Sequence, residues 1–282
     1  MTSYETTANV QRFLRRPPAH AHDAAPLEVN DLSVRFNGVT ALDRVSFTLP
    51  QGTSAAVIGP NGAGKTTLFR VIAGTLTPSS GSVQVYGDQP GGHVCIAHVP
   101  QRSRVDWDFP ASVSDVVMMG RVRKIGLFRW PTRADWNYVS DAMQRVGVGD
   151  LANRQIGELS GGQQQRVFLA QALAQEAELV LMDEPLTGLD VPSQEAIFQI
   201  LDELKRDGTT VMIATHDLNL AAERFDRVLM LNLRLIVDGP PEEALKPEVL
   251  LEGFGGHVQV LPGEDTALMV TDSCCDGEIH DA

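Results

Sequence analysis

The eight residues from Gly59 to Thr66 read Gly-Pro-Asn-Gly-Ala-Gly-Lys-Thr and fit the pattern G-x-x-x-x-G-K-[ST]. Glycines let the backbone wrap closely around phosphate groups with its N–H groups pointing inward, and a following helix adds the positive end of its dipole. Lys65 supplies charge for β- and γ-phosphates, while the Thr66 hydroxyl can ligate Mg²⁺. The pattern predicts a nucleotide site formed by Gly59, Pro60, Asn61, Gly62, Ala63, Gly64, Lys65, Thr66 and Thr67.

Two adjacent acids, Asp183 and Glu184, end the apolar run that begins at Leu179. Because neighbouring side chains of a strand point in different directions, the two carboxylates can do different work. We expect Asp183 to hold Mg²⁺ together with Thr66, and Glu184 to polarise an attacking water. Alone, such a pair is more often a helix cap or a solvated turn. Because a phosphate loop precedes it in a parallel-sheet protein, the pair is better interpreted as part of the reaction site.

The elements around these residues alternate between strands and helices. Residues 55–58 form a predicted buried strand before the loop, and residues 66–73 a helix that Gly74 closes. Further buried strands are predicted at 179–182 and 210–214, with a helix between them that starts near Pro192 and stops at Gly208. Alternating apolar residues at 32–36 and 45–49 predict antiparallel strands, and residues 102–158 are mostly helical. The fold class is α/β, with a mostly parallel sheet covered by helices on both faces.

Composition excludes several functions. The 282 residues carry a formal charge of −13, which argues against a nucleic-acid partner. No stretch approaches the roughly 20 apolar residues of a membrane span. The first residues lack an apolar signal core, and three cysteines are too few for a disulfide framework, so a reduced, cytoplasmic protein is expected.

A Leu-Ser-Gly-Gly-Gln segment ends at Gln163, 20 residues before Asp183. Read alone, Ser160 would be an ordinary helix N-cap. Together with the phosphate loop and the acidic strand end, however, the chain closely resembles the nucleotide-binding subunits of ABC transporters. The resemblance covers nearly all of residues 27–260, and its motifs occur in family order.

The resemblance assigns further roles, with ATP and Mg²⁺ as the ligands. Gln101 resembles the family's Q-loop glutamine, which would touch Mg²⁺ and the attacking water, and His216 resembles the switch histidine at the γ-phosphate. Together with Glu184 these are the implied catalytic residues. Asp190 resembles the D-loop aspartate, and Phe36 stands about where the family stacks an aromatic ring on adenine.

The resemblance also implies a domain plan: a P-loop NTPase core, an antiparallel β subdomain and an inserted helical subdomain at about residues 102–175. We expect the nucleotide-binding domain at 27–263, a flexible extension at 1–26 and an acidic, disordered tail at 264–282. In that tail, a metal-sensing role for Cys274, Cys275 and His280 is a minor alternative to plain solubilisation.

Partners follow from the same family. Two copies would pair head to tail, each offering Ser160, Gly161, Gly162 and Gln163 to the γ-phosphate held by the other, since a helix N-terminus is a good anion site. A separate multi-span permease would carry the substrate, and an extracytoplasmic metal-binding protein would deliver it. The chain would then lie on the inner face of the cell membrane.

Two segments narrow the substrate. Residues 99–121, which contain Trp107-Asp-Phe-Pro110, and residues 125–131, which contain Trp130, resemble the subfamily that imports manganese, iron or zinc, with manganese first. The aromatic residues there are otherwise expected mostly to pack the helical subdomain. Another importer class, a soluble ABC ATPase that acts on nucleic acid and a regulator without turnover are the alternatives.

Overall fold

The computed structural model describes residues 24–255, apart from 91–94, 102, 104, 127 and 128, and the backbone of the short strand pair β10 (Val258–Val260) and β11 (Leu268–Val270). Residues 1–23 of the predicted extension lie outside the described residues. The predicted tail at 264–282, with Cys274, Cys275 and His280, also lies outside them, apart from the backbone of β11. The proposed domain limits stay predictions.

A six-stranded sheet forms the centre of the molecule, in the order β5-β6-β7-β3-β8-β9. Its first five members pair in parallel, and only the edge strand β9 is antiparallel. The strands are β5 (Ile96–Val99), β6 (Leu179–Asp183), β7 (Thr210–Ala214), β3 (Ser54–Ile58), β8 (Arg227–Asn232) and β9 (Arg234–Gly239). The predicted mostly parallel sheet is confirmed.

A second sheet is antiparallel, in the order β2-β1-β4. The segments predicted at 32–36 and 45–49 are the ends of longer strands, β1 (Leu27–Phe36) and β2 (Val39–Leu49), and β4 (Ser80–Gln84) joins them. Both predicted strands are therefore present and antiparallel, as expected.

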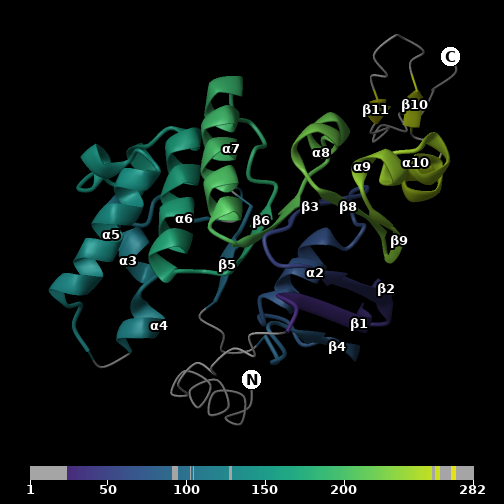
Figure 1. Cartoon of the computed structure of the whole chain (residues 1–282), viewed down its shortest axis with the longest axis horizontal. Coiled ribbons are helices and arrows are strands. Elements are labelled where there is room, and N and C mark those ends of the chain that lie inside the picture. Colours follow the sequence, from purple (N-terminus) through teal and green to yellow (C-terminus); the bar gives the residue numbers. More distant parts are fainter. Residues whose placement is uncertain are drawn as a thin grey trace, which may run out of the picture.

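The helices fall into two groups. Figure 1 shows the first group, α3, α4, α5 and α6, together at one side of the molecule. These four lie between β5 and β6, as the predicted helical insertion requires. Their bounds, with the two short 3-10 turns, are α3 (Val113–Met119), α4 (Val122–Ile125), α5 (Arg133–Arg145), η2 (Gly149–Leu151), η3 (Ile156–Glu158) and α6 (Gly161–Gln175). The others are α2 (Lys65–Ile72), α7 (Val191–Arg206), α8 (Leu218–Arg224), α9 (Pro241–Ala244) and α10 (Pro247–Phe254).

The central sheet separates two hydrophobic cores, because its side chains alternate between its faces. In β6, Leu179 and Leu181 join α2 and the antiparallel sheet in one core, whereas Val180 and Met182 join the helical insertion and α7 in the other. All four side chains are fully buried. This two-sided burial explains the continuous apolar run, which is typical of a parallel strand.

Cys95 is a buried cysteine beside β5, and it forms no disulfide in the described part of the chain. Burial, with the nearby charge of Glu178, raises its pKa to about 12. The thiol therefore stays protonated and inert, and it plays a packing role.

Candidate nucleotide site

The candidate site residues gather at the carboxyl ends of four neighbouring parallel strands. The phosphate loop follows β3, Glu184 follows β6, His216 comes shortly after β7, and Gln101 comes shortly after β5. In open α/β sheets this edge is where ligands bind. The sheet order β5-β6-β7-β3 thus places together residues that are far apart in the sequence.

Both ends of the phosphate loop lie directly against the backbone of neighbouring segments. A Cβ atom at Gly59, whose φ is +150°, would stand 2.0 Å from the carbonyl oxygen of Leu231. A Cβ at Gly64, whose φ is +98°, would stand 2.5 Å from the carbonyl oxygen of Ala41. Real Cβ atoms do not approach backbone so closely, so glycine is required at both ends of the loop.

The loop leads directly into the N-terminus of α2, which has no acidic residue in its first turn and no side-chain cap. Its first N–H groups lack intrahelical partners, and they carry the positive end of the helix dipole. The ammonium group of Lys65, only 7% exposed, donates to the carbonyl oxygens of Gly59 at 2.6 Å and Pro60 at 3.1 Å. This arrangement suits a phosphate chain.

The two acids at the end of β6 have different partners, as predicted. Asp183 is 4% exposed and accepts a hydrogen bond from the Thr66 hydroxyl at 2.7 Å. Glu184 accepts one from the side-chain amide of Gln101 at 3.2 Å. The backbone of Glu184 has a φ of +49°, a conformation rare outside glycine that costs roughly 1–3 kcal/mol and clusters at functional sites.

A hydroxyl paired with a buried carboxylate fits Mg²⁺, because hard oxygen ligands are what this ion prefers. Thr66, Asp183 and Gln101 are the side chains that could hold it. In the described part of the chain no cluster of three or more His, Cys, Asp or Glu residues offers another metal site.

His216 lies beside Glu184. Both line a cavity of about 160 Å³ whose other walls include Thr187 and Asp217. His216 is exposed, and Asp217 caps α8 by accepting from the N–H of Leu220. A histidine and a carboxylate on one cavity can both reach a reacting phosphate or water.

Ser160 is the N-cap of α6, as predicted, and it exchanges hydrogen bonds with Gln163. A Cβ at Gly162 would meet the Ser193 hydroxyl oxygen at 2.6 Å, so the first turn of α6 packs against the first turn of α7. Asp190 caps α7, and hydrogen bonds from Ser193 lower its pKa. Asp190 therefore has a structural role in this chain, beside its predicted place near the nucleotide.

Two residues that sequence reasoning missed join the site. A cavity of about 400 Å³ is lined by Gln101 and Glu184 and also by Trp107 and Gln165, together with Gly161 of α6. Among the described residues, the buried amide nitrogen of Gln165 has no hydrogen-bond partner, and the Trp107 ring packs edge-on against Phe168 with 5.9 Å between the ring centroids. The run of three glutamines that begins at Gln163 was the available signal, because two of them are buried on the helix.

Phe36 ends β1 opposite Val39 and is 42% exposed. The side chain is therefore partly open to solvent, and its stacking on adenine stays a prediction.

Comparison with known proteins agrees with this geometry. Residues 42–187 match the family described as ABC transporter. The manganese transport system ATP-binding protein MntB of Bacillus subtilis is 45% identical over 237 residues, which cover 84% of this chain and 95% of that protein. The zinc transport system ATP-binding protein TroB of Treponema pallidum is 44% identical, with coverages of 83% and 89%.

One further relative and one solved structure are also similar to this chain. The chelated iron transport system membrane protein YfeB of Yersinia pestis is 43% identical, with coverages of 86% and 83%. An ATP-binding cassette of an ABC transporter, solved in its ADP conformation, superposes with a TM-score of 0.71 at 25% identity and covers 80% of this chain and 97% of that one.

The chain therefore belongs to the ABC transporter family, and within it to the ATP-binding subunits, which are ATPases that drive transport. Its fold is that of a P-loop NTPase. None of the helices in the described part of the chain is both long and apolar enough to cross a bilayer.

The close approach of the phosphate loop to the neighbouring backbone generates a prediction about the stability of the nucleotide-free protein. Gly59→Ala should destabilise the fold strongly, because its Cβ overlaps the Leu231 carbonyl and must displace β3 or β8. Gly62→Ala is the matched control: its φ is also positive, at +81°, but a Cβ there meets nothing within 4 Å. The control should lose only about 1–2 kcal/mol, the cost of an alanine in the left-handed region. Urea denaturation of both variants measures this, and equal losses would contradict the proposed close approach.

Proposed function

We propose that this chain hydrolyses ATP to power the import of a transition metal ion, manganese first and iron or zinc next, through a separate membrane permease. The observation that carries the hydrolytic part is the pair of hydrogen bonds Thr66–Asp183 and Gln101–Glu184, which divides two adjacent carboxylates between two different partners. The metal is supported by the printed functions of the relatives, which transport manganese, zinc or chelated iron.

In this proposal the phosphate loop and the start of α2 bind the phosphates, and Lys65 turns its ammonium group from the loop carbonyls toward the β- and γ-phosphates. Thr66, Asp183 and Gln101 would hold Mg²⁺, which would supply positive charge to those phosphates. The adenine ring stacks on Phe36. These residues bind and orient the nucleotide.

Glu184 is the proposed general base. Its carboxylate takes up the proton of the attacking water, while the Gln101 amide, at 3.2 Å, keeps the carboxylate oriented. His216, across the small cavity, donates to the γ-phosphate and fixes its position. Positioning and charge stabilisation supply most of the rate of a phosphoryl transfer, because little covalent chemistry is left to the protein.

A second copy of the chain completes the site in this proposal. Ser160, Gly161, Gly162 and Gln163 form a helix N-terminus with no acid in its first turn, which suits the γ-phosphate held by the other copy. Hydrolysis would then release the pair. The permease, fed by an extracytoplasmic metal-binding protein, would convert that release into transport, with the chain placed on the inner face of the membrane.

Removal of the Glu184 carboxylate tests the mechanism. Glu184→Gln keeps the shape of the side chain and leaves Asp183 and Lys65 in place, so ATP should still bind. General-base contributions are ~10²–10⁴-fold, and turnover should fall by about that much. Steady-state phosphate release measures it, with Glu252→Gln, an exposed residue of α10, as the matched control. Near-normal turnover of Glu184→Gln would remove Glu184 from the role of base.

The paired site generates a second prediction. With hydrolysis blocked, Glu184→Gln should accumulate as an ATP-bound dimer at high protein concentration, visible by light scattering. Adding Ser160→Arg should abolish this dimer, because a bulky cation replaces the small N-cap of α6. A dimer that survives Ser160→Arg would mean that α6 does not read the γ-phosphate of the other copy.

Cellular metal content tests the substrate. Deletion of this subunit should lower manganese, or failing that iron or zinc, under metal-limited growth. Sugar and amino-acid uptake should not change, and a copy with Glu184→Gln should fail to restore the metal. Unchanged levels of all three metals would overturn the assignment.

The permease contact generates a fourth prediction. Apolar residues rimmed by acids suit a partner surface, which makes residues 105–118 the candidate stretch for this contact, but within it Val113, Val116 and Val117 are buried in the helical core. Of that stretch Phe109, 57% exposed and close to Asp106 and Asp108, remains available. Phe109→Glu should reduce co-purification with the permease and leave ATP binding intact. The control Leu251→Glu, at a residue 52% exposed on α10, should leave both co-purification and ATP binding unchanged. Normal assembly of Phe109→Glu would place the contact elsewhere.

A further inference from the structure

The segment between α4 and α5 carries a tryptophan that is almost fully exposed. Trp130 is 91% exposed, so the expectation that the aromatic residues of this region pack the helical subdomain is wrong for it. Val122, at 43%, is exposed on the neighbouring helix α4. Two backbone hydrogen bonds connect the two positions, from Arg129 to Gly126 at 3.3 Å and from Gly126 to Val122 at 2.8 Å.

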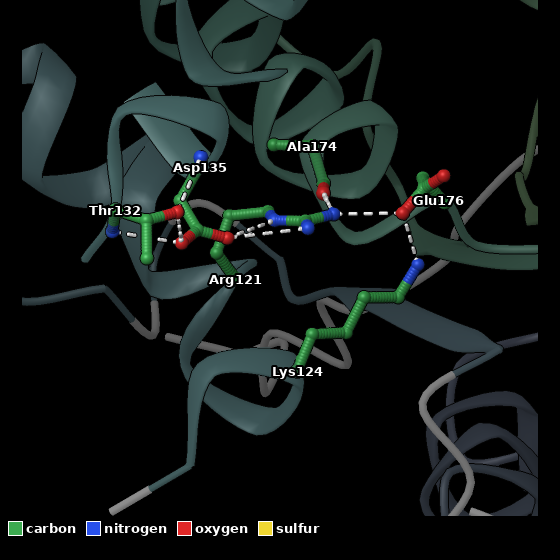
Figure 2. Close-up of polar contacts among 6 residues, drawn as sticks. All are labelled: Arg121, Lys124, Thr132, Asp135, Ala174 and Glu176. Atoms are coloured by element: carbon green, nitrogen blue, oxygen red, sulfur yellow. Dashed lines mark hydrogen bonds and ion pairs between the residues drawn. The ribbon is translucent and has the colours of Figure 1, made fainter. Parts of the chain in front are cut away.

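Both ends of this segment are held in place, as Figure 2 shows. The guanidinium group of Arg121, 6% exposed, donates to Asp135 at 3.3 Å and to the carbonyl oxygen of Ala174 at 3.0 Å. Asp135 also accepts from the Thr132 hydroxyl at 2.6 Å, and the hydrogen bonds from Thr132, with the one from Arg121, lower its pKa. Trp130 is therefore presented by a segment anchored on α5 and on the end of α6.

The charge of the segment is opposite to that of the chain. Residues 121–133 contain five Lys or Arg and no Asp or Glu, within a chain of net charge −13. Arg121 and Lys124 are matched internally, by Asp135 and Glu176. Arg129 and Arg133 are exposed, and neither makes an ion pair within the described part of the chain. The charges of Arg129 and Arg133 therefore lie close in the sequence to the exposed Trp130.

We propose that Val122, Arg129, Trp130 and Arg133, which we name the basic–tryptophan patch, bind the anionic phospholipid headgroups of a membrane surface. Tryptophan favours the membrane–water interface, where its ring sits at headgroup level. Arginine near an anionic leaflet gains electrostatic attraction that a neutral surface does not offer. The patch combines both features in one anchored segment.

A permease is a poorer occupant on charge. Cytoplasmic loops of membrane proteins carry an excess of Lys and Arg, and they would repel Arg129 and Arg133. The second copy of the proposed dimer is also a poor fit, because the patch is anchored at the far end of α6 from Ser160. With 15 residues, α6 separates the two ends by ~22 Å. The lipid contact does not rest on the proposed metal or on ATP turnover.

Vesicle flotation with the purified full-length chain, without permease, tests the proposal. The protein should float with vesicles of phosphatidylglycerol and phosphatidylcholine in equal parts, and stay at the bottom with phosphatidylcholine alone. Arg129→Glu/Arg133→Glu should lose at least roughly 30-fold of its partitioning, from the loss of two basic side chains at an anionic surface. High salt should have the same effect, since it screens the attraction.

The matched control is Arg154→Glu/Lys246→Glu, which changes the net charge equally at two other exposed positions and should float like the unchanged chain. Unaltered ATPase activity of both double variants shows that they are folded. Tryptophan emission should shift to shorter wavelength on anionic vesicles, and Trp130→Phe should remove the shift. Failure of the unchanged chain to float would overturn the proposal, and so would flotation of Arg129→Glu/Arg133→Glu at the normal level. If this variant instead fails only to assemble with the permease, the patch is a protein contact and the lipid proposal is wrong.

Discussion

The hydrogen bond between Thr66 and Asp183 is the contact on which the arrangement of the site depends. It joins the first turn of α2 to the end of β6, across 117 residues of sequence, at 2.7 Å. Asp183 is buried, and a buried carboxylate without a partner would cost far more than the net value of one hydrogen bond. The loop, the helix and the strand end are therefore held in one geometry, in which the oxygen atoms of both side chains meet.

The rest of the site follows from the register of the parallel sheet. Val99 pairs with Met182 and Asp183 pairs with Ala214, so the chain leaves β5, β6 and β7 at one edge. Between β5 and β6 the chain runs through the whole helical insertion and returns to the neighbouring strand. Gln101 lies before that insertion and Glu184 after it, and the side-chain amide of Gln101 thus comes within 3.2 Å of the Glu184 carboxylate.

The helical insertion also touches the site through α6. Gln165 of α6 and Trp107 line the same cavity as Gln101 and Glu184, and the Trp107 ring packs on Phe168 of the same helix. The amide nitrogen of Gln165 has no hydrogen-bond partner within the part of the chain that the structure describes, which is a costly state for a buried donor. At its other end α6 is fixed to the exposed segment through Arg121. The helix α6 therefore connects the cavity lined by Gln101 and Glu184 with the exposed segment of the insertion.

The amino-acid sequence was sufficient to predict the phosphate loop, the two acids at the end of a buried strand, the cap of α6 at Ser160 and the order of strands and helices. These features depend on local backbone rules and on hydrophobic periodicity, which a single chain displays. Three facts are visible only in the tertiary structure. Gln101 contacts Glu184, and Gln165 and Trp107 line the same cavity. Trp130 is exposed, whereas Val113, Val116 and Val117 are buried. Such facts depend on which strands pair and which helix faces meet, and apolar residues close together in the sequence read alike until the packing separates the buried from the exposed.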